Sequence, residues 1–328
     1  MTLFVETDSL TITLDPVDDR WGQIEGGEGK PSLPLAVALE LLVFAAAQRP
    51  TSPGHPITIH DVRQHRRLSP NSEDAFAIEL RRMGMSRLGT GTNEPAVNRH
   101  VRERWGLYCD RRDRDGQIVE HSSLHYSSVF ESVDFDVSGD WIDRLTDIEL
   151  DQRLADSIPR SRIFPVVADP GQEDAVSPSG AFGQLQSIGY GRCPGADAIP
   201  VAAAAFAAPD KSPLWCHHRR PSNDLTGPGV LAAALDLVAR FGRRMIRDQC
   251  EPVGIGQLVM GRQVDVGEPL IVIAKWLATT PGRSKKEKDG GVCTATILGA
   301  NGDLVAKLIG VDLISFTETD VIERSVPS

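Results

Sequence analysis

The sequence predicts an α+β protein in which one plan is used twice: a buried helix followed by antiparallel strands. Three features of the 328 residues support this: two long apolar helical segments, two hairpin-like segments, and the same order of these parts in both halves. Hydrophobic residues make up 41% of the chain and charged residues 24%, which is the composition of a globular protein. A chain that is disordered throughout is therefore excluded.

Both helices are predicted from runs of helix-favouring apolar residues that begin at a proline. The first covers residues 33–48 with Pro34 near its start, and the second covers 227–241 with Pro228 near its start. Proline suits the first helical turn, because its missing N–H would have no partner there in any case. Each segment is apolar on almost all sides, which is typical of a helix enclosed by the rest of the fold.

The hairpins are predicted from two turn signals that lie between strand-like runs. Asp115-Gly116 divides residues 99–126, and Asn301-Gly302 divides residues 270–315. Such pairs favour two-residue turns, because both central positions of these turns need positive φ.

The two halves also agree in spacing. Gly116 follows Pro34 by 82 residues, and Gly302 follows Pro228 by 74 residues. An internal duplication explains both the shared order and the similar spacing.

An acidic, proline-containing segment lies between the halves and is predicted to be a linker. The predicted division of the chain is therefore a first unit at 1–133, a linker at 134–179, a second unit at 180–320 and a tail at 321–328.

Charge and composition exclude several classes of function. The net charge of −10 argues against a protein that binds nucleic acid through phosphate contacts. The longest apolar run, residues 33–47, contains Glu40 and is shorter than the ~20 residues of a membrane span. Acidic residues near the start argue against a signal peptide, so a cytoplasmic protein is expected.

Neither a metal nor a cofactor is expected. The five cysteines are scattered and form no C-x-x-C pair, and no His, Cys and Asp cluster has metal-ligand spacing. The glycines at 26–29 lack the lysine and hydroxyl residue of a phosphate-binding loop.

Specific spacings around the first helix resemble the dehydratase domains of modular polyketide synthases. Those domains carry H-x-x-x-G-x-x-x-x-P, with a glutamate six residues after the proline. Here Gly29, Pro34 and Glu40 lie in the same register, and Glu25 occupies the histidine position.

The second helix extends the resemblance. The family carries H-P-x-x-x-D-x-x-x-Q at the start of this helix. Here Pro228 matches, whereas Ala232 occupies the aspartate position and Asp236 the glutamine position. The tyrosine of the family's Y-G-P turn corresponds to Phe182. The resemblance covers residues 8–316 and implies a double hotdog, that is, two tandem helices, each wrapped by an antiparallel sheet.

The replacements change the chemistry that the resemblance implies. The family uses its histidine as the base and its aspartate as the acid when it dehydrates a β-hydroxyacyl thioester. The ordinary pKa of a carboxylate such as Glu25 lies well below that of an imidazole, so it is the weaker base unless burial raises its pKa. Ala232 has no proton to donate. Standard dehydration is therefore not expected.

The preferred function is the cyclisation or isomerisation of a polyketide intermediate in an apolar cavity. Glu25 would act as the base or hydrogen-bond acceptor, and Asp236 as a second acid or acceptor. The N–H groups at the two helix starts would polarise a carbonyl of the substrate. The residues expected to line the substrate are Trp21, Gly29, Pro34, Phe182, Pro228 and Ala232.

Two alternatives stay open. One is a dehydratase with a rearranged site, in which Asp224, just before the second helix, supplies the displaced acid or base. The other is a non-catalytic scaffold that binds a polyketide chain or a carrier protein.

The expected partner is a small acyl or polyketide chain. The basic loop at 279–291 is either a solvated hairpin tip or a docking patch for an acidic acyl carrier protein. Pairing of two copies through their sheet edges is left open.

Overall fold

The computed structural model describes residues 9–15, 32–47, 58–68, 75–88, 100–112, 117–133, 163–165, 185–192, 199–209, 227–280 and 289–316. The helices are α1 (Leu35–Ala47) and α3 (Pro228–Ile246). The strands are β1 (Ser9–Leu14), β2 (Thr58–Gln64), β3 (Phe76–Leu88), β4 (His100–Arg112), β5 (Ile118–Val133), β6 (Ile163–Pro165), β7 (Leu185–Arg192), β8 (Pro200–Ala207), β9 (Gln249–Met260), β10 (Pro269–Thr280), β11 (Gly290–Gly299) and β12 (Leu304–Phe316).

All described strands belong to one antiparallel sheet, in the order β1-β3-β4-β5-β2-β9-β12-β11-β10-β8-β7-β6. The first half contributes β1-β3-β4-β5-β2, and the second half contributes the mirrored order β9-β12-β11-β10-β8. In each of these two five-strand sets, one strand (β1 or β8) precedes the helix in the chain and four strands follow it. This repeated topology is the one that an internal duplication produces, and it is consistent with a hotdog fold.

The two halves meet where β2 pairs with β9, and this pairing makes the sheet continuous. Beyond β8, β7 and then β6 extend the edge of the second half. β6 lies within the predicted linker at 134–179, so a part of that segment belongs to the sheet. The boundaries of the units remain predictions.

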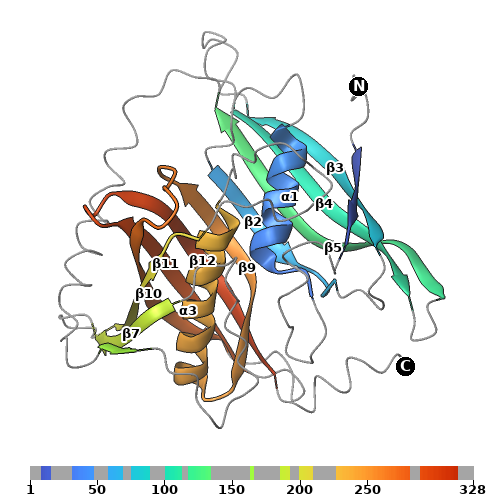
Figure 1. Cartoon of the computed structure of the whole chain (residues 1–328). Helices are drawn as coiled ribbons and strands as arrows, with labels where there is room; N and C mark the ends of the chain where they lie inside the picture. The colour runs from blue at the N-terminus through green and yellow to red at the C-terminus, as the bar shows by residue number, and fades with distance from the viewer. Residues whose placement is uncertain are drawn as a thin grey trace.

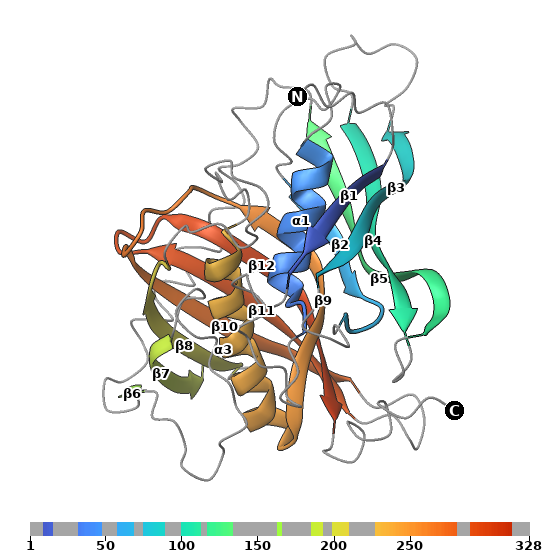
Figure 2. The same cartoon turned by 45° about the vertical axis from the view of Figure 1, so that its right-hand side comes forward.

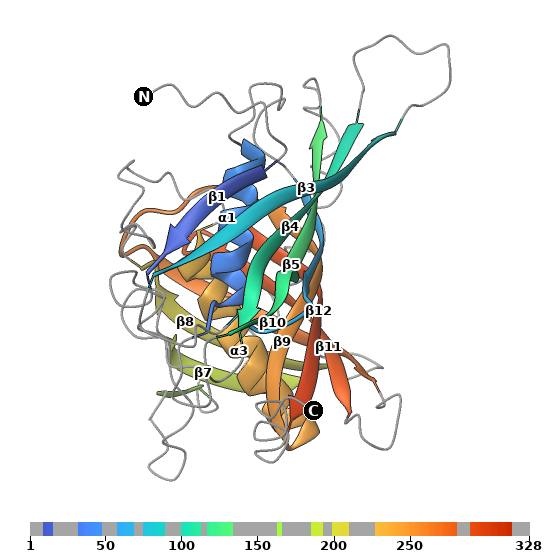
Figure 3. The ribbon, with the colours of Figure 1, turned by 90° about the vertical axis from the view of Figure 1, so that its right-hand side faces the viewer.

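The sheet curves around both helices, which lie beside each other in Figures 1 and 2. α1 packs against β3, β4 and β5, whereas α3 packs against β8–β12. Figure 3 shows the first-half strands β1, β3, β4 and β5 on the side that faces the viewer. One hydrophobic core cluster contains side chains from both helices and from both halves of the sheet.

Both predicted helices are present, and they differ in character. α1 is buried on almost every side, and even Glu40 is only 3% exposed. The first three turns of α3 are buried except at Ala232 and Asp236, and α3 continues five residues beyond the predicted end at Phe241. Those extra residues include Arg243 and Arg244. Because arginine is charged, the apolar run on which the prediction was based ends before them.

The predicted antiparallel pairing is present, β4 with β5 and β11 with β12. Asp115 and Gly116 lie outside the described residues, and the segment 270–315 contains three strands, β10, β11 and β12, rather than two. The turn between β11 and β12 differs in type from the expectation. Gly302 N–H donates to the carbonyl of Gly299 at 2.9 Å, and Gly299 N–H donates to the carbonyl of Asp303 at 2.9 Å. Gly302 has φ 83°, but Asn301 has negative φ. The loop is thus a three-residue turn with a bulged glycine, because Ala300 also belongs to it.

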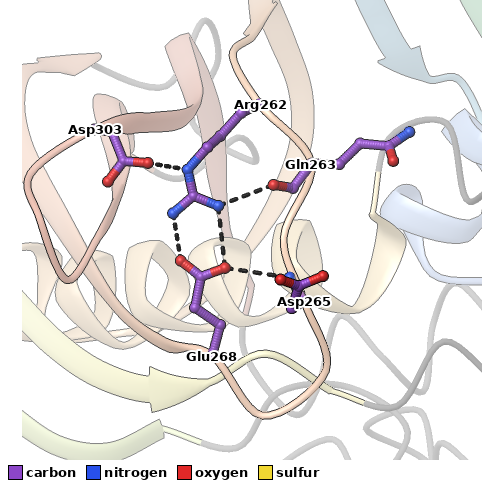
Figure 4. A network of polar contacts seen from close by, with 5 residues as sticks. All are labelled: Arg262, Gln263, Asp265, Glu268 and Asp303. Atoms are coloured by element: carbon purple, nitrogen blue, oxygen red, sulfur yellow. Dashed lines mark hydrogen bonds and ion pairs between the residues drawn. The ribbon is translucent and has the colours of Figure 1, made fainter.

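A polar network fixes this turn to the β9–β10 connection. Arg262 lies between two carboxylates and donates to both Asp303 and Glu268 (Figure 4). Its guanidinium also donates to the carbonyl of Gln263 at 2.9 Å, and Glu268 accepts the N–H of Asp265 at 3.2 Å. One arginine therefore joins two loops at the same end of the second half.

The start of α1 is fixed from two sides. Leu33 N–H donates to the carbonyl of Leu68, just after β2, at 2.9 Å. The Tyr126 hydroxyl on β5 donates to the carbonyl of Leu33 at 2.5 Å. Burial raises the pKa of Tyr126, so its hydroxyl keeps the proton that it donates.

Replacing Tyr126 with phenylalanine should lower the free energy of unfolding by about 1–3 kcal/mol, because the buried Leu33 carbonyl loses its donor. Urea unfolding of both proteins measures this difference. Tyr108→Phe is the matched control, because Tyr108 is only half-buried and its ring stacks against Arg81. Equal stabilities of Tyr126→Phe and the unchanged protein would contradict the assigned role.

Candidate functional site

One face of α3 is less buried than the rest of the helix. Ala232, Asp236, Arg240 and Arg243 follow one another at spacings of four, four and three residues, so they form a single stripe. All four are partly exposed, whereas the residues between Ala232 and Asp236 are buried. This stripe carries Ala232 and Asp236, two of the predicted site residues, and we call it the α3 stripe.

The carboxylate of Asp236 is held by an arginine one turn later. Arg240 Nε lies 3.0 Å from both carboxylate oxygens of Asp236. The exposed fractions of the two side chains are 20% for Arg240 and 15% for Asp236, so the pair is largely shielded from water.

Burial raises the pKa of the Asp236 carboxyl, and this effect exceeds the lowering by Arg240 and Arg243. Asp236 therefore retains a proton to a higher pH than an exposed aspartate does. A carboxyl of this kind is able both to accept a hydrogen bond and, when protonated, to donate one.

The start of α3 lies one turn before Ala232. Gly227 precedes the helix with φ 59°, and no side chain caps the first turn. The carbonyl of Gly227 accepts the N–H groups of Val230 at 2.9 Å and Leu231 at 3.0 Å. Because Pro228 has no N–H, Gly229 carries the N–H that this turn leaves for a carbonyl ligand. Gly229 is therefore the one residue of this first turn whose backbone N–H is expected to donate to a substrate carbonyl.

Pro34 lies at the start of α1, where its carbonyl accepts the N–H of Ala38 at 2.9 Å. α1 and α3 pack against each other, so the two predicted helix starts belong to the same enclosed helix pair. Five predicted residues lie outside the described part of the chain: Glu25, Asp224, Trp21, Gly29 and Phe182. Residues 281–288 of the predicted docking loop also lie outside it.

The sequence prediction did not include Arg240, the ion-pair partner of Asp236. The i,i+4 spacing of Asp236 and Arg240 was a usable signal, because side chains four residues apart on a helix are neighbours. Arg240 lies outside the dehydratase motif, so the motif positions alone do not point to it.

The described residues contain neither a metal-ligand cluster nor a membrane-spanning helix. No group of three or more His, Cys, Asp or Glu side chains among them is arranged to hold a metal ion. No helix in the described ranges is long and apolar enough to cross a membrane.

The ion pair on the α3 stripe yields a stability prediction. Arg240→Gln should lower the free energy of unfolding at neutral pH by about 1–3 kcal/mol, less than the roughly 3–5 kcal/mol for a fully buried pair. The cause is the uncompensated Asp236 carboxylate, so Asp236→Asn in the same chain should restore most of the loss. A double-mutant cycle by urea unfolding measures the coupling between the two residues.

The same variants should differ in their pH dependence. The pKa of Asp236 is higher in the folded than in the unfolded chain, so the folded protein binds this proton more tightly. The contribution of Asp236 to stability is therefore lost as pH rises through its folded pKa. Arg240→Gln raises that pKa further and should extend the loss to higher pH, whereas Asp236→Asn should remove it. Parallel pH profiles of the three proteins would contradict this assignment.

Comparison with known proteins relates the fold to one group of structures. No protein-family model matches the chain, and no curated protein matches it. A trans-AT polyketide synthase dehydratase domain from Brevibacillus brevis matches with a TM-score of 0.58 and 10% identity, over 94% of this chain and 93% of that one. The dehydratase domain of the CurF module of curacin polyketide synthase matches with a TM-score of 0.54 and 13% identity, over 96% of both chains.

A third structure matches over a similar length. It is an inactive mutant of the CurK dehydratase in which an aspartate is replaced by asparagine. It matches with a TM-score of 0.51 and 14% identity, over 97% of each chain. The chain thus has the fold of polyketide synthase dehydratase domains over nearly its whole length.

Proposed function

We propose that this chain is a dehydratase-like double-hotdog enzyme of polyketide biosynthesis that cyclises or isomerises its substrate without removing water. The two units of the double hotdog are residues 1–133 and 180–320. The substrate is an acyl or polyketide chain that lies between the two helix starts.

The observation that carries the proposal is the composition of the α3 stripe. Ala232 occupies the position at which the dehydratase motif has its aspartate, and Ala232 is partly exposed on that stripe. The first ionisable side chain along the stripe is Asp236, one turn further on. In the related CurK dehydratase, even the replacement of an aspartate by asparagine gives a protein described as inactive. Removal of a hydroxyl group needs an acid, and Ala232 supplies none.

The remaining groups suit a reaction in which a proton only changes its place. In an isomerisation, a base takes a proton from one carbon of a conjugated thioester or ketone, and an acid returns a proton to another carbon. In a ring closure, a hydroxyl oxygen of the substrate adds to its own activated double bond, and the hydroxyl proton ends on the neighbouring carbon. Neither reaction releases water or consumes a cofactor.

Each candidate group has a defined part in this scheme. Glu25, by its place in the motif, is the proposed base. Asp236, whose pKa burial raises, is the proposed acid or hydrogen-bond donor to the substrate carbonyl. Gly229 N–H, at the positive end of α3, would polarise the same carbonyl. An enclosed site also holds the two reacting ends of the chain close together, which is a major source of rate in ring closure.

The Asp236–Arg240 ion pair also favours one rival function, a scaffold that binds a polyketide chain without changing it. A carboxylate that is fully engaged by an arginine is not free to transfer protons. The rearranged dehydratase with Asp224 is the third possibility. The three functions predict different outcomes with the same substrates: an isomer, a product that has lost water, or binding without conversion.

The decisive experiment incubates the purified protein with a β-hydroxyacyl pantetheine thioester and with an unsaturated hydroxyacyl thioester, followed by mass spectrometry and NMR. The expected product has the same mass as its substrate and a changed bond pattern. A product lighter by one water from the β-hydroxyacyl thioester would overturn the proposal in favour of a dehydratase. Binding without any conversion would favour the scaffold.

Asp236→Asn should lower turnover by about 10²-fold or more, which is the usual contribution of an acid–base group. Arg240→Gln is the matched comparison, because it breaks the same ion pair but keeps the carboxyl. Arg240→Gln should retain much more activity than Asp236→Asn, and its pH optimum should move upward with the pKa of Asp236. Equal losses in the two variants would assign the effect to the ion pair rather than to the acid.

Restoring the motif should restore the missing reaction. Glu25→His combined with Ala232→Asp should produce measurable loss of water from the β-hydroxyacyl thioester, because base and acid are then both present. Each single variant serves as the control and should remain inactive in dehydration. An inactive, folded double variant would show that the register of the motif is wrong.

A further inference from the structure

A pocket of about 410 Å³ lies between the last turns of α3 and strands β7 and β8. Its walls include Tyr190, Arg192, Pro200, Phe241, Arg244 and Met245. This volume is within the usual range of small-molecule sites, roughly 300–1,000 Å³. We propose that the pocket binds an organic anion, whose apolar part contacts Phe241, Pro200 and Met245 and whose carboxylate or phosphate pairs with Arg244.

Arg244 is oriented before any ligand arrives. Its guanidinium carbon lies 4.6 Å from the ring centre of Tyr190, which is a cation–π contact. A guanidinium stacked in this way keeps the N–H groups at its edge available, and that planar edge matches the oxygens of a carboxylate or phosphate. The contact with the Tyr190 ring thus restricts the orientation of the Arg244 guanidinium, whose side chain is otherwise flexible.

Arg244 also differs from its helical neighbour Arg240 in its charge partners. Arg240 is neutralised by Asp236. Within the ranges that the structure describes, Arg244 forms no ion pair with an acidic side chain. The positive charge of Arg244 is therefore available to an anion that enters the pocket.

The apolar wall of the pocket is held in place by aromatic packing. The ring centres of Tyr190 and Phe241 lie 6.2 Å apart, and Phe241 meets Trp276 edge-on at 5.9 Å. Phe241 is buried, so its ring is fixed by the core. A ligand with an apolar body gains contact area here at little cost in side-chain ordering.

The local charge favours an anion although the whole chain is acidic. Four arginines and two aspartates lie between residues 236 and 248, and Arg192 faces the same pocket from β7. A local positive excess on a chain of net charge −10 attracts small anions toward this end of α3. Arginines near a helix C-terminus also stabilise the helix, so a test must separate binding from stability.

Two sources supply an anion on an apolar body. An acyl chain on a phosphopantetheine arm carries a phosphate, and a released acyl chain carries a carboxylate. The site does not depend on the proposed reaction, because it would bind either anion whether or not the protein converts its substrate.

Isothermal titration calorimetry of the full chain with octyl phosphate, octanoate and inorganic phosphate tests the proposal. Octyl phosphate or octanoate should bind with saturation and more tightly than inorganic phosphate. Tighter binding of octyl phosphate would identify the pantetheine phosphate as the source, and tighter binding of octanoate the free acid. Inorganic phosphate binding as tightly as both probes, or no saturable binding at all, would overturn the proposal.

Arg244→Gln should weaken binding of the preferred probe by about tenfold or more, because a charge-assisted contact is lost. Arg247→Gln removes the same charge from an exposed residue outside the pocket walls and should leave binding unchanged. Equal losses in both variants would assign the effect to net charge and overturn the site. If Arg244→Gln does not fold, Arg244→Lys should fold and still bind more weakly, because lysine lacks the planar fork.

Discussion

Enclosure of α1 is the constraint on which the rest of the structure depends. Because this helix has almost no polar side, it is stable only where apolar groups surround it, and strands of the first half cover only a part of it. The second half supplies α3 on one side and β9 beside the strands of the first half. Each half therefore completes the core of the other, and a single cluster of buried side chains links them.

The same packing determines where chemistry is possible on α3. In the first three turns of α3 the buried positions are taken up by contacts with the sheet and with α1, so side chains there are accessible only on the α3 stripe. In the last turns Arg244 and Met245 are exposed as well. Near its start this stripe has an alanine and an aspartate, and toward its end it has arginines. The proposed reaction site therefore lies near the start of α3, and the anion pocket lies at its last turns.

The parts of the fold that could be predicted from the sequence depend on local patterns. The apolar runs after Pro34 and Pro228 predicted both helices, because a helix that is buried on most sides consists mainly of apolar residues. The turn near Asn301 was predicted in place but not in type, since Ala300 joins the loop without any compositional sign. Contacts between distant residues gave no such signal: Tyr190 and Arg244 are separated by 54 positions, and Arg262 and Asp303 by 41. Glu25 and the other motif residues outside the described ranges stay predictions.

The β2–β9 pairing has a consequence for the history of the chain. β2 and β9 are the strands that directly follow α1 and α3, and they pair antiparallel, as two equivalent edges do across a two-fold axis. A single unit would associate with its own copy through that edge, and its assembly would depend on protein concentration. Fusion replaces this dimerisation with a contact inside one chain. The two helices differ in their last turns: α3 carries Arg243 and Arg244 there, whereas the last turn of α1 has no basic residue.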